Sequence, residues 1–445
     1  MKHTLVAAAL ATLFGTAFAA GNAPDAVVIG AGGAGLTAAV TLTDLGRHVV
    51  VLEKMPMLGG NTVRAEGGIN AAETPQQKKA GIPDTIEQFY KDTMKGGHNI
   101  NDPALVHTLT AHAKDAVAWL ESLGADLQTV GRAGGATYAR AHRPTDGSAI
   151  GPEVIRVLWK ATKDRNIDVR TQSRAVELIT DKSGAVAGVK VSTKDGKTYT
   201  LDTKAVVLAT GGFGANQDLL VKYQPKLKGY ATTNQPGATG DGILLAEKAG
   251  AALVDMTKIQ AHPTAAPNGT LISESVRGDG AILVNAEGKR FTNELLTRDV
   301  VSANELKQPG KFAWIVWDEA TRKTAKLIDS YKKLGLTVEG STVAELARAM
   351  NVPAEALEAT MAKYAADQKA GKDTAFGRPD MPQPLTTAPF YAVKVQPAVH
   401  HTMGGVKIDT KAEVLSASGK AIPGLFAAGE VTGGVHGGNR LGGNA

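Results

Sequence analysis

The chain has 445 residues, of which 43% are hydrophobic and 21% are charged. This length and composition predict a folded protein of two or three domains rather than a disordered chain. The formal net charge of +6, from 49 Lys and Arg against 43 Asp and Glu, is small for this size and does not indicate a nucleic-acid-binding protein. The sequence has no cysteine. Disulfides, iron–sulfur clusters, thiolate zinc sites and attached c-type haem are therefore excluded, and redox chemistry requires an organic cofactor.

The first residues have the layout of a secretory signal peptide. Lys2 and His3 precede an apolar run at 4–20, and residues 17–19 place alanine at the two positions that specify cleavage. The alternative, a membrane anchor, is disfavoured because the run contains Gly15 and is shorter than the ~20 strongly apolar residues of a spanning helix. We therefore expect a signal peptide at 1–19, export to the periplasm and no stable membrane anchor.

The next segment predicts a dinucleotide-binding βαβ unit. A β-branched strand at 25–29 leads into a glycine-rich turn at 30–35, followed by a helix at 36–45 and a second strand at 48–52. An acid closes the second strand at the distance at which dinucleotide-binding proteins place a ribose-binding residue. The glycines let backbone N–H groups approach a pyrophosphate, and the alternative is a strand–helix turn without a ligand. The candidate cofactor-binding residues here are Gly30, Gly32, Gly33, Ala34, Gly35, Glu53 and Lys54.

Further glycine-rich turns expose backbone later in the chain. Glycine pairs occur at 59–60 and 67–68, an apolar strand at 205–210 ends in glycine, and residues 424–430 repeat this pattern. Residues 184–202 predict a β-hairpin with an Asp-Gly turn. The cofactor-binding candidates in these later segments are Gly60, Asn61, Thr62, Gly67, Gly68, Ala209, Thr210, Gly211, Asp241 and Glu430.

The sequence pattern at about 257–401 differs from that of the flanking segments, which predicts an inserted domain. It contains a hairpin turn at 285–288 and two helices. Thr342 and Glu345 open the first helix as a capping box, and Pro353 lies in the first turn of the second. The expected fold class is α/β, a Rossmann-like nucleotide-binding domain with an inserted α+β capping domain. The nucleotide-binding domain would consist of residues 20–256 and 402–445.

Several motifs in the second half place histidines, arginines and acids beside glycine-rich turns. They lie at 260–264, where a histidine precedes a proline in an expected turn, and at 273–278, 297–299, 399–405 and 436–440. Taken alone, each has an ordinary alternative: a hydrogen-bonded structural histidine, a surface Glu–Arg pair or a solvated arginine. On a strand, His400 and His401 would point to opposite sides, which disfavours a zinc site.

Together and in this order, the motifs resemble the fumarate reductase/succinate dehydrogenase flavoprotein family. Within that family they are most similar to the soluble, exported fumarate reductases of the flavocytochrome c type. The resemblance runs from about residue 25 to Ala445. It is carried by IQAHPT at 259–264, VRGDGAI at 276–282, TRD at 297–299, VHHTMGG at 399–405 and AGEVTGGVHGGNRLGGNA at 428–445.

The resemblance implies that the nucleotide-binding domain binds FAD and that a mobile capping domain closes over it. Hydride would pass from flavin N5 to the C=C of fumarate, giving succinate. Guanidinium groups suit this substrate because they bind carboxylates bidentately. By matching motifs, the carboxylates of a C4-dicarboxylate would be held by His262, Ser273, His400 and Arg440. Arg298 would donate the proton, Glu274 and Arg277 would form its proton relay, and Glu430 would contact the flavin.

Three departures from the family pattern lead to further expectations. Asn61 occupies the position of the histidine that attaches FAD covalently in membrane-bound relatives, so we expect non-covalent FAD. The haem-bearing domain of one-chain flavocytochromes has no counterpart, so electrons would come from a separate cytochrome c or quinol-linked donor. Relatives continue beyond Ala445 into a last helix, and we therefore expect the chain to be a fragment.

Three alternatives share the scaffold and flavin. The protein could reduce another unsaturated carboxylate, such as urocanate or methacrylate, or act as a ketosteroid dehydrogenase. It could also be a flavin-binding electron-transfer subunit without catalysis of its own.

Overall fold

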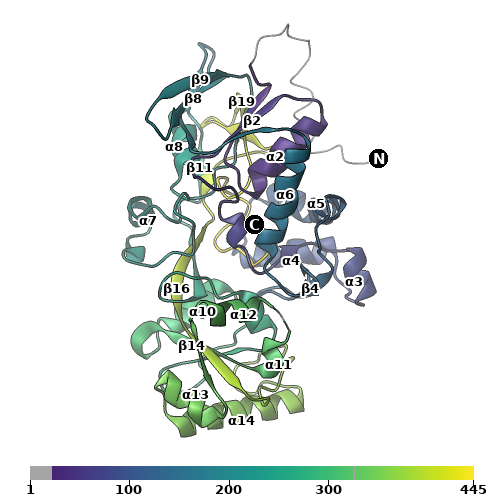
Figure 1. The fold of residues 1–445 in the computed structure, drawn as a ribbon, viewed down its shortest axis with the longest axis vertical. Helices are drawn as coiled ribbons and strands as arrows, with labels where there is room; N and C mark the ends of the chain where they lie inside the picture. The colour runs from purple at the N-terminus through teal and green to yellow at the C-terminus, as the bar shows by residue number, and fades with distance from the viewer. Residues whose placement is uncertain (1–22, 325) are drawn as a thin grey trace.

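The computed structural model describes residues 23–324 and 326–445, so the expected signal peptide lies outside the described residues. A six-stranded sheet forms one half of the elongated molecule (Figure 1). Five of its strands are parallel and β18 pairs antiparallel with β19 at one edge. In spatial order the strands are β18 (Glu413–Leu415), β19 (Ala421–Ala427), β10 (Val206–Leu208), β1 (Ala26–Ile29), β2 (Val49–Leu52) and β6 (Asp168–Arg170).

The central strands are buried on both faces, as expected for a parallel sheet covered on each side. Val27 and Val50 belong to one hydrophobic core cluster, and their neighbours Val28 and Val51 belong to the other. The predicted strand–turn–helix–strand unit is confirmed, with α2 (Gly33–Asp44) beginning inside the predicted turn. The predicted strands at 205–210 and 424–430 correspond to β10 and β19.

Shorter elements surround this sheet. The predicted hairpin at 184–202 is confirmed as β8–β9, and β7 adds a third antiparallel strand. Within the described residues, no helix combines the length and apolar character of a membrane span. The surrounding elements are η1 (Thr62–Arg64), β3 (Ile69–Asn70), α3 (Pro75–Lys79), α4 (Ile86–Gly96), α5 (Pro103–Ser122), β4 (Thr129–Gly131), β5 (Ala141–Arg143), α6 (Ile150–Asp164), β7 (Ser173–Thr180), β8 (Val186–Thr193), β9 (Thr198–Asp202), α7 (Gln217–Tyr223), η2 (Pro225–Leu227), α8 (Asp241–Lys248), β11 (Leu253–Val254) and β17 (Gly405–Val406).

A second, antiparallel sheet forms the other half, in the order β12-β16-β14-β13, with β15 also pairing β16. All its strands come from 259–402, and we infer that residues 257–401 form the capping domain. Its elements are β12 (Ile259–Ala265), α9 (Glu274–Gly278), β13 (Ile282–Val284), α10 (Arg298–Glu305), η3 (Pro309–Lys311), β14 (Ala313–Asp318), α11 (Glu319–Arg322), α12 (Leu327–Lys333), β15 (Thr337–Gly340), α13 (Val343–Met350), α14 (Ala354–Ala370) and β16 (Phe390–Thr402).

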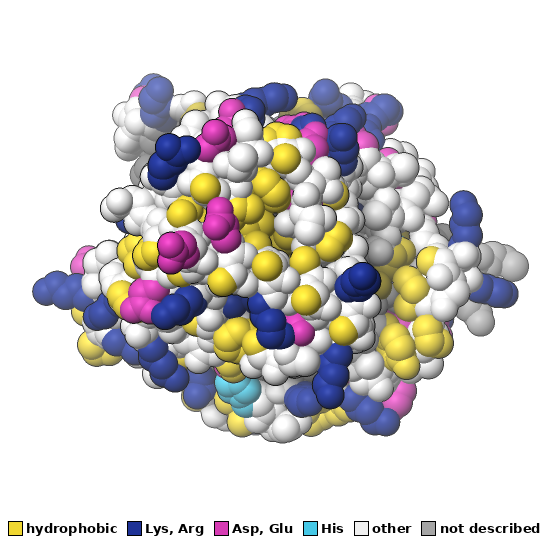
Figure 2. Space-filling model, turned by 90° about the horizontal axis from the view of Figure 1, so that it is seen from below, with side chains coloured by type: hydrophobic (Ala, Val, Ile, Leu, Met, Phe, Trp, Pro, Cys, Tyr) yellow, Lys and Arg dark blue, Asp and Glu magenta, His cyan; other side chains and the backbone are white. Residues whose placement is uncertain are grey.

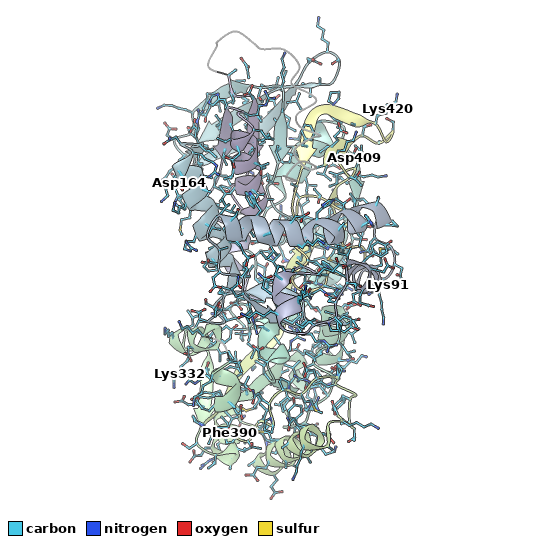
Figure 3. All side chains as sticks on the ribbon, turned by 90° about the vertical axis from the view of Figure 1, so that its right-hand side faces the viewer. Lys91, Asp164, Lys332, Phe390, Asp409 and Lys420 are labelled. Carbon is cyan, nitrogen blue, oxygen red and sulfur yellow. The ribbon has the colours of Figure 1, made fainter. Side chains whose placement is uncertain are left out.

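Strand β16 connects the two halves of the molecule (Figure 1). It is 13 residues long and pairs with β12, β14 and β15. Its first residue, Phe390, lies near one end of the molecule, whereas Lys420, just before β19, lies near the other (Figure 3). The strand therefore carries the chain from the capping half back to the sheet of the nucleotide-binding half.

Local predictions in the capping half hold with small differences. Thr342 caps α13 by accepting from Glu345 N, but the Glu345 carboxylate accepts from Ser341 N, one residue earlier than in a capping box. Pro353 is the N-cap of α14 rather than a residue of its first turn. The turn at 285–288 follows β13, and its second arm is a single bridge.

The end face of the capping half has mixed surface chemistry. Lys and Arg side chains are scattered among acidic and hydrophobic side chains rather than gathered in one basic stripe (Figure 2). The histidine and Glu–Arg motifs of this half lie on the opposite side, where it meets the nucleotide-binding half.

Candidate active site

A cavity of about 600 Å³ lies where the two halves meet. Its walls include backbone of the glycine-rich turn and side chains from α9, α10 and β16. The predicted cofactor-binding residues that line it are Gly30, Gly32, Gly33, Ala34, Glu53, Lys54, Gly60, Asn61, Thr62, Gly67, Gly68, Ala209, Thr210, Gly211, Asp241 and Glu430. The predicted substrate and proton-relay residues that line it are His262, Ser273, Glu274, Arg298, His400 and Arg440.

Two predicted residues lie behind the cavity wall. A Cβ added at Gly35 would lie 1.8 Å from the carbonyl oxygen of Gly30, so this glycine lets α2 pack against the end of β1. Gly30 itself has a φ of +108°, and a Cβ there would lie 2.3 Å from the carbonyl oxygen of Ala209.

Arg277 is fully buried beside Glu274, behind the lining. Burial excludes the surface-pair alternative for these two residues.

The glycine-rich turn is shaped to hold an anion. Helix α2 begins at Gly32 without a side-chain cap, so N–H groups of its first turn are left for a ligand. The exception is Gly33 N, which donates to Thr62 Oγ1 at 3.0 Å. Glu53 accepts from Ala31 N at 3.0 Å and Met55 N at 2.8 Å. The acid thus fixes the turn and borders the cavity, where its carboxylate fits a ribose hydroxyl.

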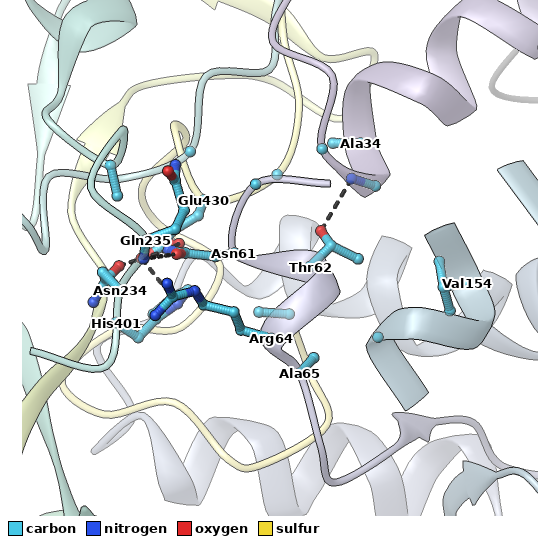
Figure 4. Close-up of a pocket in the computed structure, with 18 of the residues that line it drawn as sticks. Ala34, Asn61, Thr62, Arg64, Ala65, Val154, Asn234, Gln235, His401 and Glu430 are labelled. Carbon is cyan, nitrogen blue, oxygen red and sulfur yellow. Dashed lines mark hydrogen bonds and ion pairs between the residues drawn. The ribbon is translucent and has the colours of Figure 1, made fainter. Parts of the chain in front are cut away.

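Asn61 joins two walls of the cavity (Figure 4). Its side-chain amide donates to Asn234 Oδ1 at 2.6 Å and to Glu430 Oε2 at 3.3 Å, and its oxygen accepts from Gln235 N at 2.8 Å. At another side, Lys54 Nζ lies 3.1 Å from Asp241 Oδ2. Uncapped N–H groups, close glycines and the Glu53 carboxylate at the cavity wall fit the pyrophosphate and ribose of FAD.

Two histidines face each other at the capping side of the cavity. The ring centroids of His262 and His400 are 4.9 Å apart. Burial and nearby arginines lower the pKa of each well below its usual value, so both are neutral near pH 7. His400 Nδ1 is 2.7 Å from Thr233 Oγ1, whereas His262 Nε2 has no hydrogen-bond partner among the described residues. That nitrogen is available to a bound ligand.

The predicted turn around His262 is wrong. This residue lies in strand β12, and its pairing with β16 shifts register both before Ala261 and after His262. His400 and His401 both line the cavity but have different neighbours: the His400 ring faces His262 and the His401 ring faces His436. At the register shift, Gln260 pairs with His401 and Ala261 with Val399, which leaves His400 as an extra residue of β16.

Gln260 links the two arginines of the cavity. Its side-chain nitrogen donates to the Arg440 carbonyl oxygen at 2.7 Å, and its oxygen accepts from Arg298 Nη1 at 3.1 Å. Burial, followed by repulsion from Arg298, lowers the pKa of Arg440 to about 9. Arg440 Nε has no hydrogen-bond partner among the described residues. Two buried guanidiniums that repel each other and line one cavity favour an anionic ligand there.

The predicted relay residues lie in one row. Arg298 Nη2 is 2.7 Å from Glu274 Oε2, and Arg277 Nη2 is 3.7 Å from Glu274 Oε1. Burial acts to raise the pKa of Glu274, but the two arginines outweigh it, and this pKa lies below its usual value. Glu274 is therefore an ionised carboxylate that lies between two arginines.

Ser273 is held by a chain of hydrogen bonds that crosses between the two halves. Its backbone N–H donates to Tyr331 Oη at 2.9 Å, and Tyr331 donates to Glu66 Oε2 at 2.9 Å. The Ser273 hydroxyl is the N-cap of α9 and accepts from Ser275 N at 3.2 Å. Glu66 follows η1 in the nucleotide-binding half, so this chain connects the substrate region to the cofactor segment.

Sequence reasoning missed several lining or supporting residues: Gln260, His401, His436, Tyr331 and Glu66. Gln260 could have been found, because it lies two residues before His262 on an alternating strand. His401 Nδ1 lies 3.3 Å from Glu430 Oε1. The described residues include no group of three or more His, Asp or Glu positioned to hold a metal ion.

Comparison with known proteins agrees with this geometry. Residues 25–445 match the model of the FAD binding domain family. A fumarate reductase (cytochrome) from Shewanella frigidimarina is 51% identical over 422 residues, which cover 95% of this chain and 74% of that protein. A urocanate reductase from Eggerthella lenta is 37% identical over 435 residues, covering 94% of this chain and 71% of that protein.

A solved structure shares the fold. The open conformation of a flavocytochrome c3 fumarate reductase matches with a TM-score of 0.78 at 47% identity, covering 95% of this chain and 75% of that one. The α/β fold with a Rossmann-like FAD-binding domain is therefore established. The chain belongs to the FAD-binding domain family and, within it, to the fumarate reductase/succinate dehydrogenase flavoproteins.

Proposed function

We propose that the protein is an FAD-dependent oxidoreductase that reduces the C=C bond of fumarate, giving succinate. One observation carries this proposal: two buried arginines, Arg298 and Arg440, line a cavity whose other end has the features of an FAD site. A fumarate-sized dianion beside these two guanidiniums would neutralise the positive charge that they place in the cavity wall.

The substrate carboxylates would be held by a set of fixed donors. Arg440 would bind one carboxylate, with the free His262 Nε2 and His400 donating to the substrate as neutral imidazoles. Ser273 would donate its hydroxyl. Neutral histidines hydrogen-bond a dianion without adding further charge to a buried site that already contains two arginines.

When bound, FAD supplies the hydride that adds to one alkene carbon. Negative charge then builds on the other carbon and its carboxylate, and the fixed cations stabilise that charge as it develops. Arg298 would give its proton to this carbon. A free arginine does not lose its proton near pH 7, but a developing carbanion is far more basic, and Glu274 lies 2.7 Å away to return the proton.

We further propose that FAD is bound non-covalently, since Asn61 rather than histidine lies in the glycine-rich segment that follows Glu53. A periplasmic location is proposed from the leader-like residues at 1–19. A separate cytochrome c or quinol-linked donor is proposed because the sequence contains no cysteine to attach a c-type haem.

The test is steady-state kinetics on the FAD-loaded protein, with reduced methyl viologen as electron donor. Fumarate, urocanate and methacrylate are assayed side by side. We expect the highest kcat/KM with fumarate, by about a hundredfold or more, because a monocarboxylate leaves part of the donor set unpaired. Competitive inhibition by malonate should accompany this preference. Preference for urocanate or methacrylate, or flavin-loaded protein without turnover, would contradict the proposal.

A further inference from the structure

The Glu274 carboxylate is held from both halves of the molecule. Arg298 binds one of its oxygens, Oε2, through Nε and Nη2, each at 2.7 Å. The other oxygen, Oε1, accepts from Gly134 N at 2.8 Å, whereas Arg277 Nη2 lies 3.7 Å from it. A carboxylate bound at one oxygen can still turn about its terminal C–C bond. The Gly134 N–H group therefore fixes the plane in which Glu274 faces Arg298.

Gly134 belongs to a tight turn that presents two successive N–H groups to the capping half. The turn spans 133–136, and a backbone hydrogen bond of 3.2 Å joins its ends. While Gly134 N donates to the carboxylate, Gly135 N donates to the Leu295 carbonyl oxygen at 3.3 Å. Leu295 lies just before α10, whose first residue is Arg298. The turn thus contacts both segments that carry the acid–arginine pair.

Both central positions of this turn require glycine. Gly135 has a φ of +81°, and a Cβ there would lie 2.7 Å from Leu441 Cδ2. A Cβ at Gly134 would lie 2.5 Å from Glu274 Oε1 and 2.9 Å from the Leu296 carbonyl oxygen. The carboxylate thus approaches position 134 too closely for any side chain there.

Asp92 on α4 fixes the end of this loop. Its Oδ2 accepts from Thr137 N at 2.8 Å, and its Oδ1 accepts from Thr137 Oγ1 at 2.7 Å. Arg140 Nη2 lies 2.8 Å from the same Oδ2 and pairs with Asp84 as well. Asp92 and Arg140 are both buried. Because buried, fully paired charge networks are rigid, Thr137, directly after the turn, is held against α4.

We propose that the turn at 133–136, anchored by Asp92, is a positioning element for the Glu274–Arg298 pair. This rests on the proposed function. The turn holds the carboxylate in the plane that keeps Oε2 against the guanidinium, and so keeps the proton donor in its place in the cavity wall. Gly134 and Asp92 lie outside the lining of the cavity. They therefore act through Glu274 and not by touching substrate or FAD.

The first test compares wild type with Gly134→Ala, whose added Cβ would displace Glu274 Oε1 from the N–H group. Stopped-flow reoxidation of the reduced, FAD-loaded protein by fumarate gives a limiting rate and an apparent Kd. We expect the limiting rate to fall at least about tenfold, because misplacing a general acid costs factors of this size. The apparent Kd, the FAD content and the rate of flavin reduction by viologen should stay within about twofold, since residue 134 does not line the cavity.

A second pair of variants tests the anchor without changing the turn. Thr137 is exposed, and Thr137→Val removes the hydroxyl that donates to Asp92. We expect its limiting rate to fall at least about threefold, because the loop then holds Gly134 less precisely. Thr137→Ser keeps the hydroxyl and should retain more of the rate than Thr137→Val. Thr200→Val, the same change at an exposed position of β9, should match wild type.

An unchanged limiting rate in Gly134→Ala would overturn this proposal while leaving the proposed function intact. A loss confined to the apparent Kd would also overturn it, because the turn would then serve binding alone. Equal losses in Thr137→Val and Thr137→Ser would do the same for the anchor. Should Gly134→Ala fail to fold, the Thr137 pair decides, and unchanged rates in both variants overturn the proposal. Failure of wild type itself to reduce fumarate would instead refute the proposed function.

Discussion

Arg298 and Glu274 come from two different helices of the capping half and meet through a single carboxylate oxygen: both Nε and Nη2 of Arg298 lie 2.7 Å from Glu274 Oε2. The other oxygen, Oε1, accepts from Gly134 N at 2.8 Å. Gly134 belongs to the loop between β4 and β5 of the nucleotide-binding half. The pair that would deliver the proton therefore lies where the two halves touch.

Replacing Arg298 with Gln should abolish most fumarate reduction. The amide cannot donate a proton to the carbanion-like carbon, and it leaves Glu274 without its closest cation. We expect kcat to fall by about a thousandfold or more, within or beyond the usual range for general acids. FAD should stay bound, because the glycine-rich turn is untouched. Stopped-flow reoxidation of the reduced flavin by fumarate measures the loss directly.

Arg348→Gln provides the matched control for that variant. Arg348 is exposed on α13 and lies outside the cavity lining, so its rates should equal those of wild type. Reoxidation of Arg298→Gln at the wild-type rate would show that another group supplies the proton.

Binding of fumarate should weaken as pH rises through about 9. Burial and Arg298 lower the pKa of Arg440 to about 9, and only its cationic form attracts a carboxylate. Below this pH the cation is fully present, and above it each pH unit should cost about tenfold in kcat/KM. A bound dianion stabilises the cationic form of Arg440, so kcat should change less with pH than kcat/KM. A kcat/KM profile from about pH 7 to about pH 10 measures the effect.

Arg440→Lys should preserve a charged binding group, whereas Arg440→Gln should raise the KM at every pH and lose the alkaline limb. A limb that persists unchanged in Arg440→Gln would assign the titration to another residue.

The local part of this site could be predicted from sequence. The β1–turn–α2–β2 unit follows from a short apolar strand, closely spaced glycines and a terminal acid, all within about thirty residues. Its details then depend on contacts that sequence does not reveal. Gly35 packs against Gly30, and Glu53 accepts two backbone N–H groups as well as lining the cavity.

The assembled part could be predicted only as a set of motifs. Gln260 contacts Arg298 and Arg440 across 38 and 180 positions of sequence, and no local pattern indicates such a partner. The extra residue at His400 results from a register shift between β12 and β16, which periodicity alone does not predict. The link from Ser273 through Tyr331 to Glu66 likewise requires the two halves to be docked.

FAD should leave the protein on acid precipitation. Covalent attachment requires a nucleophilic side chain, and Asn61 is a hydrogen-bonded amide held by Asn234, Gln235 and Glu430. Trichloroacetic acid should therefore give a yellow supernatant and a colourless pellet, measured by absorbance near 450 nm. Flavin fluorescence in the washed pellet would contradict non-covalent binding.

The link between Glu66 and Tyr331 should make stability depend on pH. Burial raises the pKa of Glu66 from 4.5 to about 8, so the folded state keeps a proton that the unfolded state releases. The stabilising effect of this proton is complete below about pH 4.5 and is lost as pH rises towards about 8. Replacing Glu66 with Gln removes the titration and leaves a neutral acceptor for the Tyr331 hydroxyl.

We therefore expect Glu66→Gln to gain about 1–3 kcal/mol in free energy of unfolding relative to wild type between about pH 5.5 and about pH 8. Urea unfolding of FAD-saturated protein, followed by tryptophan fluorescence, measures it. Glu247→Gln, at an exposed position of α8, should show no pH-dependent difference. Tyr331→Phe should instead lose about 1–3 kcal/mol, because it leaves the buried Ser273 N–H without an acceptor. A difference between Glu66→Gln and wild type that stays constant with pH would mean that the Glu66 carboxyl is already ionised in the folded protein, and that the contact with Tyr331 holds the two halves together as a charged hydrogen bond.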